Sequence, residues 1–148
     1  MSKKIKILIL EHDLNDIDMI ENELKLNTID YISKVVRTEH DYIDALNEYV
    51  PNIILSDFSI PSFNGLTAFK LREHLLPAAP FIFVSGTIGE ETSIELMKNG
   101  VTDFVQKDKI FTLNTKLLRA LKDAQALEEK NKTERALVLS EARLAEAQ

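Results

Sequence analysis

The sequence contains no cysteine among its 148 residues. This absence excludes a disulfide framework, a thiolate metal site and a cysteine nucleophile, and it favours a reducing compartment, for which we expect the cytoplasm. Long apolar runs are missing as well: the first run ends at Glu11, which makes it too short for the core of a signal peptide or for a membrane span. We therefore expect no membrane association.

A basic surface is also missing. The chain carries 18 Lys and Arg against 24 Asp and Glu, a formal net charge of −6 at pH 7. Non-specific nucleic-acid binding needs clustered Lys and Arg that displace counterions from the phosphates, so we expect no nucleic-acid partner. A small anion would have to be held locally, with help from a cation. The length fits one compact domain with an appendage.

Short apolar runs alternate with segments of helical periodicity along most of the chain. The expected strands are residues 4–10, 31–37, 53–55, 81–84 and 101–106. The expected helices are residues 13–26, 38–49, 66–75 and 90–99. Strictly alternating strands and helices predict an α/β fold: a doubly wound parallel sheet with right-handed crossovers and helices on both faces. On the first two helices the spacing predicts these buried residues: Leu14, Ile17, Ile20, Leu24, Ile43, Leu46 and Tyr49.

From Leu113 onward the sequence has neither Gly nor Pro and is rich in Ala, Leu, Glu, Lys and Arg, which predicts one long helix to Gln148. Four leucines in its first part are expected to pack on the sheet: Leu113, Leu117, Leu118 and Leu121. Further on, apolar residues are sparse, and this part is a weak coiled coil, a connector to another domain or a solvated helix. We divide the chain into a domain of residues 1–123 and a helical linker or coiled-coil extension of residues 124–148.

Polar groups follow several of the expected strands. Asp57 ends the most apolar strand, and Pro61 and Asn64-Gly65 turn the chain after it. The other groups are Glu11-His12-Asp13, Ser85-Gly86-Thr87 and Lys107. The carboxyl ends of parallel strands share one edge, where ligands bind. The set suits phosphoryl transfer to Asp57 as nucleophile, with Mg²⁺ held by Asp57 and a neighbouring acid, and with Lys107 and Ser85 on the remaining phosphate oxygens.

Four motifs together resemble a response-regulator receiver domain: the acidic segment after the first strand, residues 57–65, residues 81–86, and Asp103-Phe-Val-Gln-Lys107. The resemblance covers roughly residues 4–123. It implies a flavodoxin-like five-stranded sheet in the order 2-1-3-4-5 with five helices, the last one extended. It also implies that Asp57 accepts a phosphoryl group from a histidine kinase or phosphotransfer domain. Self-phosphorylation from a phosphodonor and self-dephosphorylation would be the only chemistry.

The resemblance also implies the role of each site residue. Glu11, Asp57 and the backbone carbonyl of Ser59 belong to the Mg²⁺ site, and Lys107 binds the phosphate. Ser85 is the switch hydroxyl, Phe104 is the switch aromatic, and Gly65 serves the loop turn. Phosphorylation would reshape the face made by the fourth helix, the fifth strand and the fifth helix. The C-terminal helix would then carry the change to a further domain or, as a homodimer, to a second protomer.

One departure from the family pattern matters: His12 stands where relatives carry a second acid. Imidazole is a poor ligand for Mg²⁺ and a better one for Zn, Ni or Cu, so we expect weakened Mg²⁺ binding, with His12 or the adjacent Asp13 as a further ligand. The alternative is a pseudo-receiver, an interaction module that is not phosphorylated because His12 disables the metal site. A small phosphatase fits less well, since Ser59 stands where such enzymes carry a second Asp. Asp108 replaces a proline of many relatives, and the isomer of the Lys107–Asp108 bond is left open.

Overall fold

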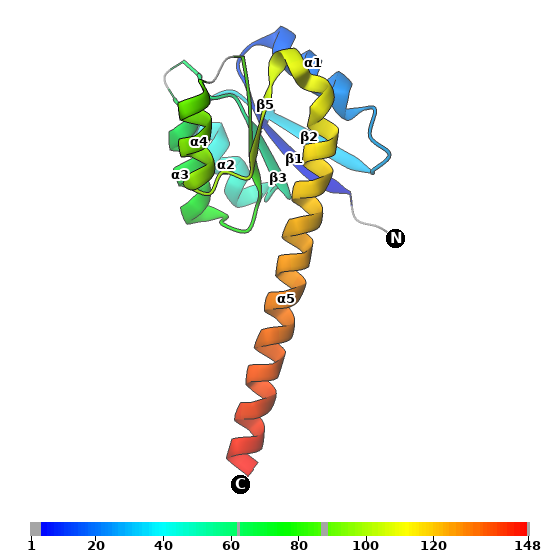
Figure 1. Ribbon diagram of the computed structural model, residues 1–148, viewed down its shortest axis with the longest axis vertical. Helices are drawn as coiled ribbons and strands as arrows, with labels where there is room; N and C mark the ends of the chain where they lie inside the picture. Colours follow the sequence, from blue (N-terminus) through cyan, green and yellow to red (C-terminus); the bar gives the residue numbers. More distant parts are fainter. Residues whose placement is uncertain (1–3, 62, 87–88, 148) are drawn as a thin grey trace.

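A five-stranded parallel sheet forms the centre of the protein (Figure 1). The computed structural model describes residues 4–61, 63–86 and 89–147. The strands are β1 (Ile5–Leu10), β2 (Tyr31–Val36), β3 (Ile53–Ser56), β4 (Phe81–Ser85) and β5 (Asp103–Gln106). They pair in the order β2-β1-β3-β4-β5, all parallel, so the predicted order is confirmed.

Helices connect the strands and extend the chain beyond the sheet. They are α1 (Leu14–Leu24), α2 (Glu39–Glu48), α3 (Gly65–Leu75), α4 (Glu90–Lys98) and α5 (Leu113–Ala147). A 3₁₀ segment, η1 (Lys107–Thr112), joins β5 to α5, and we did not predict it. Asp13, Thr38 and Asn64 begin the first three helices, since each side chain accepts a hydrogen bond from a backbone N–H in the first turn. None of the helices in the described ranges combines the length and the apolar character that a membrane span needs.

Each face of the sheet carries its own apolar core, as expected for a doubly wound sheet. Residues of β1, β3 and β4 alternate between the two cores because successive strand side chains point to opposite faces. One core contains Leu8, Ile54 and Phe83 together with residues of α2, α3 and α4. The other contains Ile9, Leu55 and residues of α1 and α5. The helices therefore sandwich the sheet, and its carboxyl edge is left to the loops.

Two residues of the predicted cores are wrong, and one buried residue was missed. Leu14 is 66% exposed because it is the first residue of α1, next to the loop at the edge of the sheet. Leu118 is 38% exposed, since the buried face of α5 follows Leu117 and Ala120 instead. On α2 the prediction missed Tyr42, which is fully buried, whereas Tyr49, just after the helix, packs partly buried against the same core. The Tyr42 hydroxyl donates a hydrogen bond to the Ala68 carbonyl of α3 at 2.7 Å, which satisfies the polar end of a buried ring.

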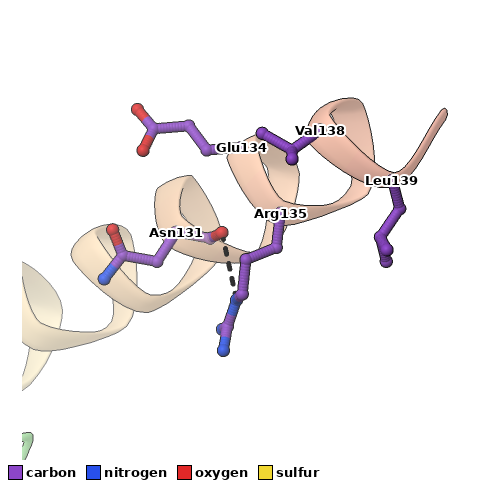
Figure 2. Close-up of a pocket in the computed structure, with 5 residues that line it drawn as sticks. All are labelled: Asn131, Glu134, Arg135, Val138 and Leu139. Carbon is purple, nitrogen blue, oxygen red and sulfur yellow. Dashed lines mark hydrogen bonds between the residues drawn. The ribbon is translucent and has the colours of Figure 1, made fainter. Parts of the chain in front are cut away.

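α5 is one continuous helix of 35 residues that runs far past the sheet (Figure 1). Its first turns pack on the sheet through Leu113, Leu117 and Ala120, and every side chain from residue 125 to residue 145 is exposed. Figure 2 shows a shallow groove on this exposed part, lined by Asn131, Glu134, Arg135, Val138 and Leu139. One helix supplies the whole lining, so the groove encloses no ligand.

Gly65 lies where the loop after β3 returns to the sheet. A Cβ atom there would lie 2.6 Å from the carbonyl oxygen of Asp57 and 2.6 Å from a ring carbon of Phe83. The Gly65 N–H also donates a hydrogen bond to the Phe58 carbonyl at 2.9 Å. A side chain at this position would therefore push the Asp57 loop away from β4.

We predict that Gly65→Ala lowers the free energy of unfolding by about 2 kcal/mol, because the new methyl group overlaps backbone that cannot move freely. Gly86→Ala is the matched control, since among the described residues no heavy atom beyond its chain neighbours lies within 4 Å of the added Cβ. Urea denaturation followed by circular dichroism measures both variants. Equal stabilities for the two variants would show that the loop moves aside at little cost.

Candidate functional site

Charged side chains from three strand ends meet at the carboxyl edge of the sheet. Glu11 follows β1, Asp57 follows β3, and Lys107 follows β5. The Lys107 Nζ atom lies 2.9 Å from Glu11 Oε2 and 3.5 Å from Asp57 Oδ2. The two carboxylates are 0% and 6% exposed. They therefore share one ammonium group in surroundings largely closed to water.

The Glu11 carboxylate is fixed by the backbone of the two residues that follow it. Its Oε1 atom accepts hydrogen bonds from the N–H groups of His12 at 3.0 Å and Asp13 at 3.1 Å. Burial raises the pKa of the Glu11 carboxyl above its ordinary value; hydrogen bonds from Lys107 and the Asp13 N–H oppose this rise, and the charge of Asp57 adds to it. Burial thus destabilises the charged form of Glu11, and the ammonium of Lys107 offsets part of this cost.

Asp16 of α1 is a member of the cluster that we did not predict. Its Oδ2 atom accepts a 2.7 Å hydrogen bond from Lys107 Nζ, the shortest contact of that ammonium. Burial alone lowers the pKa of Lys107, but the hydrogen bonds to Asp16 and Glu11 outweigh it, so that the net shift is upward. Lys107 therefore stays protonated at physiological pH. The available sequence signal was the position of Asp16 in the first turn of the helix after Glu11.

His12 points into the same cluster, and Asp13 does not. The His12 Nδ1 atom lies 3.4 Å from Glu11 Oε1 and 4.0 Å from Asp57 Oδ2. Asp13 is exposed, and its carboxylate caps α1 by accepting a hydrogen bond from the Asp16 N–H at 3.0 Å. Of the two further ligands considered from the sequence, the structure brings only the imidazole beside the carboxylates.

Three donor groups in this cluster suit a divalent cation. Glu11, His12 and Asp57 each offer one ligand atom, and these atoms lie within 4.8 Å of one another. The Ser59 N–H donates to Asp57 Oδ1 at 3.4 Å, which places the Ser59 backbone beside that carboxylate. Carboxylate and carbonyl oxygens fit a hard cation such as Mg²⁺, whereas imidazole is the one donor that Mg²⁺ does not favour. A second group, His40, Asp41 and Asp44, lies exposed on α2.

The expected switch residues lie on β4, which pairs with β3, and on β5, the edge strand that pairs with β4. Ser85 is the last residue of β4, is buried, and pairs with Gln106, which directly precedes Lys107. Phe104 pairs with Phe83 and packs, partly buried, against the core under α2, α3 and α4. Lys116 of α5 donates a 2.7 Å hydrogen bond to the Phe104 carbonyl, so α5 is tied to β5.

Two remaining expectations concern the loops of this edge. Thr87, part of the polar loop after β4, lies outside the described residues. The peptide bond between Lys107 and Asp108, whose isomer was left open, is trans, since no cis bond occurs in the described ranges.

We predict that Asp57→Asn raises the free energy of unfolding by roughly 1 kcal/mol in metal-free buffer. Three carboxylates face one ammonium in this cluster, and the substitution removes one of the excess negative charges without changing the shape of the side chain. Urea denaturation in the presence of a chelator measures the effect. Asp44→Asn on α2, where the side chain is 51% exposed, is the control and should change little. A loss of stability in Asp57→Asn would mean that attraction to Lys107 outweighs the repulsion.

Comparison with known proteins gives consistent matches over most of the chain. The sequence profile of the response regulator receiver domain matches residues 7–121. The chain is similar to the luminescence regulatory protein LuxO of Vibrio campbellii, with 30% identity over 93 residues, covering 60% of this chain and 20% of LuxO. It is also similar to a protein-glutamate methylesterase/protein-glutamine glutaminase of Caldanaerobacter subterraneus subsp. tengcongensis, with 31% identity over 115 residues, covering 72% of this chain and 29% of that protein. The chain thus spans less than a third of the length of either relative.

Solved structures share the fold. The signal receiver domain of a putative LuxO repressor protein from Vibrio parahaemolyticus superposes with a TM-score of 0.76 at 19% identity, over 85% of this chain and 96% of that one. The Mn²⁺-bound form of response regulator Rcp1 superposes with a TM-score of 0.63 at 22% identity, over 84% and 91% of the two chains. At these identities the likeness shows the fold alone.

Proposed function

The chain belongs to the response regulator receiver domain family, and we propose that it is a phosphoaccepting domain of a two-component phosphorelay with Asp57 as the acceptor. One observation carries the proposal: Asp57 lies at the carboxyl edge of the sheet, 3.5 Å from the ammonium of Lys107. The donor would be a histidine kinase or a phosphotransfer domain, and the location would be the cytoplasm.

Asp57 would act as the nucleophile of the transfer. A bond forms between its carboxylate oxygen and phosphorus, while the phosphorus–nitrogen bond of the partner's phosphohistidine breaks and its electron pair returns to the imidazole. Lys107, held protonated by Asp16 and Glu11, would neutralise charge on the phosphoryl oxygens. A divalent cation, Mg²⁺ in the family, would supply the remaining neutralisation from Glu11, Asp57 and the Ser59 carbonyl. His12 is expected to weaken Mg²⁺ there.

The response to phosphorylation would pass through Ser85 and Phe104. The added phosphoryl oxygens would draw the Ser85 hydroxyl inward and make room for the Phe104 ring. Phe104 is only partly buried and has no hydroxyl, so its movement would depend on packing. Because Lys116 bonds the Phe104 carbonyl, movement there would reach α5 and the face formed by α4, β5 and α5.

We predict that the full chain, incubated with acetyl phosphate and either Mg²⁺ or Mn²⁺, gains one phosphoryl group, detected by intact-protein mass spectrometry. Asp57→Asn should abolish the gain, because it removes the nucleophile. Asp103→Asn is the matched control, since Asp103 lies on β5 and pairs with Lys116 outside the cluster.

The alternative function, a pseudo-receiver that only binds partners, makes the opposite prediction. No mass increase at saturating metal and phosphodonor would support it, and recovery of the increase in His12→Asp would assign the defect to the imidazole. His12 is the observation that favours this alternative, since its ring nitrogen lies 4.0 Å from Asp57 Oδ2.

We also propose that residues 124–148 form a coiled-coil linker that joins two copies of the chain. Its side chains are exposed from residue 125 to residue 145, and the leucines and the valine among them are about 60% exposed: Leu127, Leu137, Val138, Leu139 and Leu144. A solvated helix without a partner is marginal in water, so a partner along this segment would stabilise it. Leu137 and Leu144 are seven residues apart and share one face, as in a coiled coil.

We predict that sedimentation equilibrium gives about twice the monomer mass for the full chain at micromolar concentrations, and that the double variant Leu137→Glu/Leu144→Glu is monomeric, because it places charges on the contact face. The control Gln125→Glu/Ala136→Glu adds the same charges on a different side of the exposed helix and should stay dimeric. A wild-type chain that is monomeric at every concentration would favour the connector instead.

A further inference from the structure

The imidazole of His12 is the part of the acidic cluster that phosphoryl transfer does not use. The side chain as a whole is 40% exposed, but its Nδ1 atom faces inward, is buried and, within the described part of the chain, has no hydrogen-bond partner. A buried ring nitrogen in this state has lost its hydration without compensation, which is uncommon and calls for a physical reason. A ligand that accepts its lone pair would provide that compensation.

Two hydrogen bonds hold the backbone of His12, one at its N–H and one at its carbonyl. Its N–H donates a 3.0 Å hydrogen bond to Glu11 Oε1, and its carbonyl accepts a 2.6 Å hydrogen bond from Arg37 Nη2. These contacts fix the direction in which the side chain leaves the loop, toward the carboxylates. A donor already held in place loses less conformational freedom when it binds a ligand.

The distances would let one small ion lie between His12 Nδ1 and Asp57 Oδ2, beside Glu11 Oε1, which also accepts two backbone N–H bonds. Donor atoms about 2.1 Å from a shared ion lie about 3.0 to 3.4 Å apart. His12 Nδ1 is 3.4 Å from Glu11 Oε1, and its 4.0 Å distance to Asp57 Oδ2 needs only a small side-chain movement. Lys107 lies against the other oxygen of Glu11, Oε2. The ammonium and an ion would therefore occupy different sides of the same carboxylate.

One neutral nitrogen and two carboxylates form a donor set with a definite preference. Mg²⁺ prefers an all-oxygen octahedron, whereas Zn²⁺ and its neighbours in the first transition row accept imidazole together with carboxylate. We propose that Glu11, His12 and Asp57 form a site that binds a divalent first-row transition ion of the Co²⁺ to Zn²⁺ group in preference to Mg²⁺. The proposal rests on the proposed function in one respect, since the ion would serve the same Asp57 carboxylate.

Isothermal titration calorimetry of the full chain with Zn²⁺ and, separately, Mg²⁺ tests the proposal without any phosphodonor. We expect Zn²⁺ to bind at one tight site, and His12→Asp to weaken Zn²⁺ binding by about tenfold or more while strengthening Mg²⁺ binding. The matched control is His40→Gln, which removes the imidazole of the exposed group on α2 and should leave the tight site unchanged. Because His12→Asp adds a further carboxylate to the cluster, His12→Gln, which removes the imidazole without adding a charge, is the second variant and should also weaken Zn²⁺ binding.

A second readout identifies the ligand directly. The chain has three histidines, so ¹⁵N spectra of the imidazoles are simple to assign with single variants, and Zn²⁺ should shift the His12 Nδ1 resonance. An unchanged ratio of Zn²⁺ to Mg²⁺ affinity in His12→Asp, or loss of the tight site in His40→Gln, would overturn the proposal. Failure of phosphorylation with the Zn²⁺ preference intact would remove the proposed function and leave this site standing.

Discussion

The ammonium of Lys107 is the contact on which the carboxyl edge of the sheet depends. It lies within 3.5 Å of carboxylate oxygens from Glu11, Asp16 and Asp57, which follow β1, belong to α1 and follow β3. Burying such charges costs several kcal/mol per ion unless opposite charges and hydrogen bonds offset the loss of water. One side chain at the end of β5 thereby holds together three segments that are distant in the sequence.

The compensation is incomplete, and the cluster keeps more negative than positive charge. Three carboxylates face one lysine, and burial raises the pKa of Glu11 even though two backbone N–H groups and Lys107 stabilise its charge. A cation bound at this edge of the sheet would reduce the excess of negative charge. Functional sites commonly keep such an excess because the same charges that destabilise the empty site bind its ligand. Gly65 contributes to this arrangement, because its lack of a side chain lets the Asp57 loop lie close against Phe83.

Much of this arrangement could be predicted from the sequence, for a physical reason. Alternating apolar strands and periodic helices specify a parallel sheet whose strands end at one edge, which predicted that Glu11, Asp57 and Lys107 share that edge; the strand order came from the family resemblance. Contacts that depend on the rotation of a helix about its axis, or on which of two partners a side chain binds, could not be predicted in this way. The contact of Asp16 depends on how α1 is rotated about its axis, and Asp13 turned away because capping α1 uses its carboxylate. Tyr42 is buried because a carbonyl of α3 meets its hydroxyl, which no pattern within α2 reveals.

Because α5 is long, a small change in its direction at the sheet would displace its C-terminal end by a larger distance. At 1.5 Å per residue the 35-residue helix is about 50 Å long, and its last 24 residues extend about 36 Å beyond the part that packs on the sheet. The root of the helix is attached to β5 through Lys116, so a tilt of about five degrees there would displace the far end by roughly 4 Å. Under the proposed function the helix would act as a lever arm, converting a small tilt at the sheet into a displacement comparable to an atomic diameter.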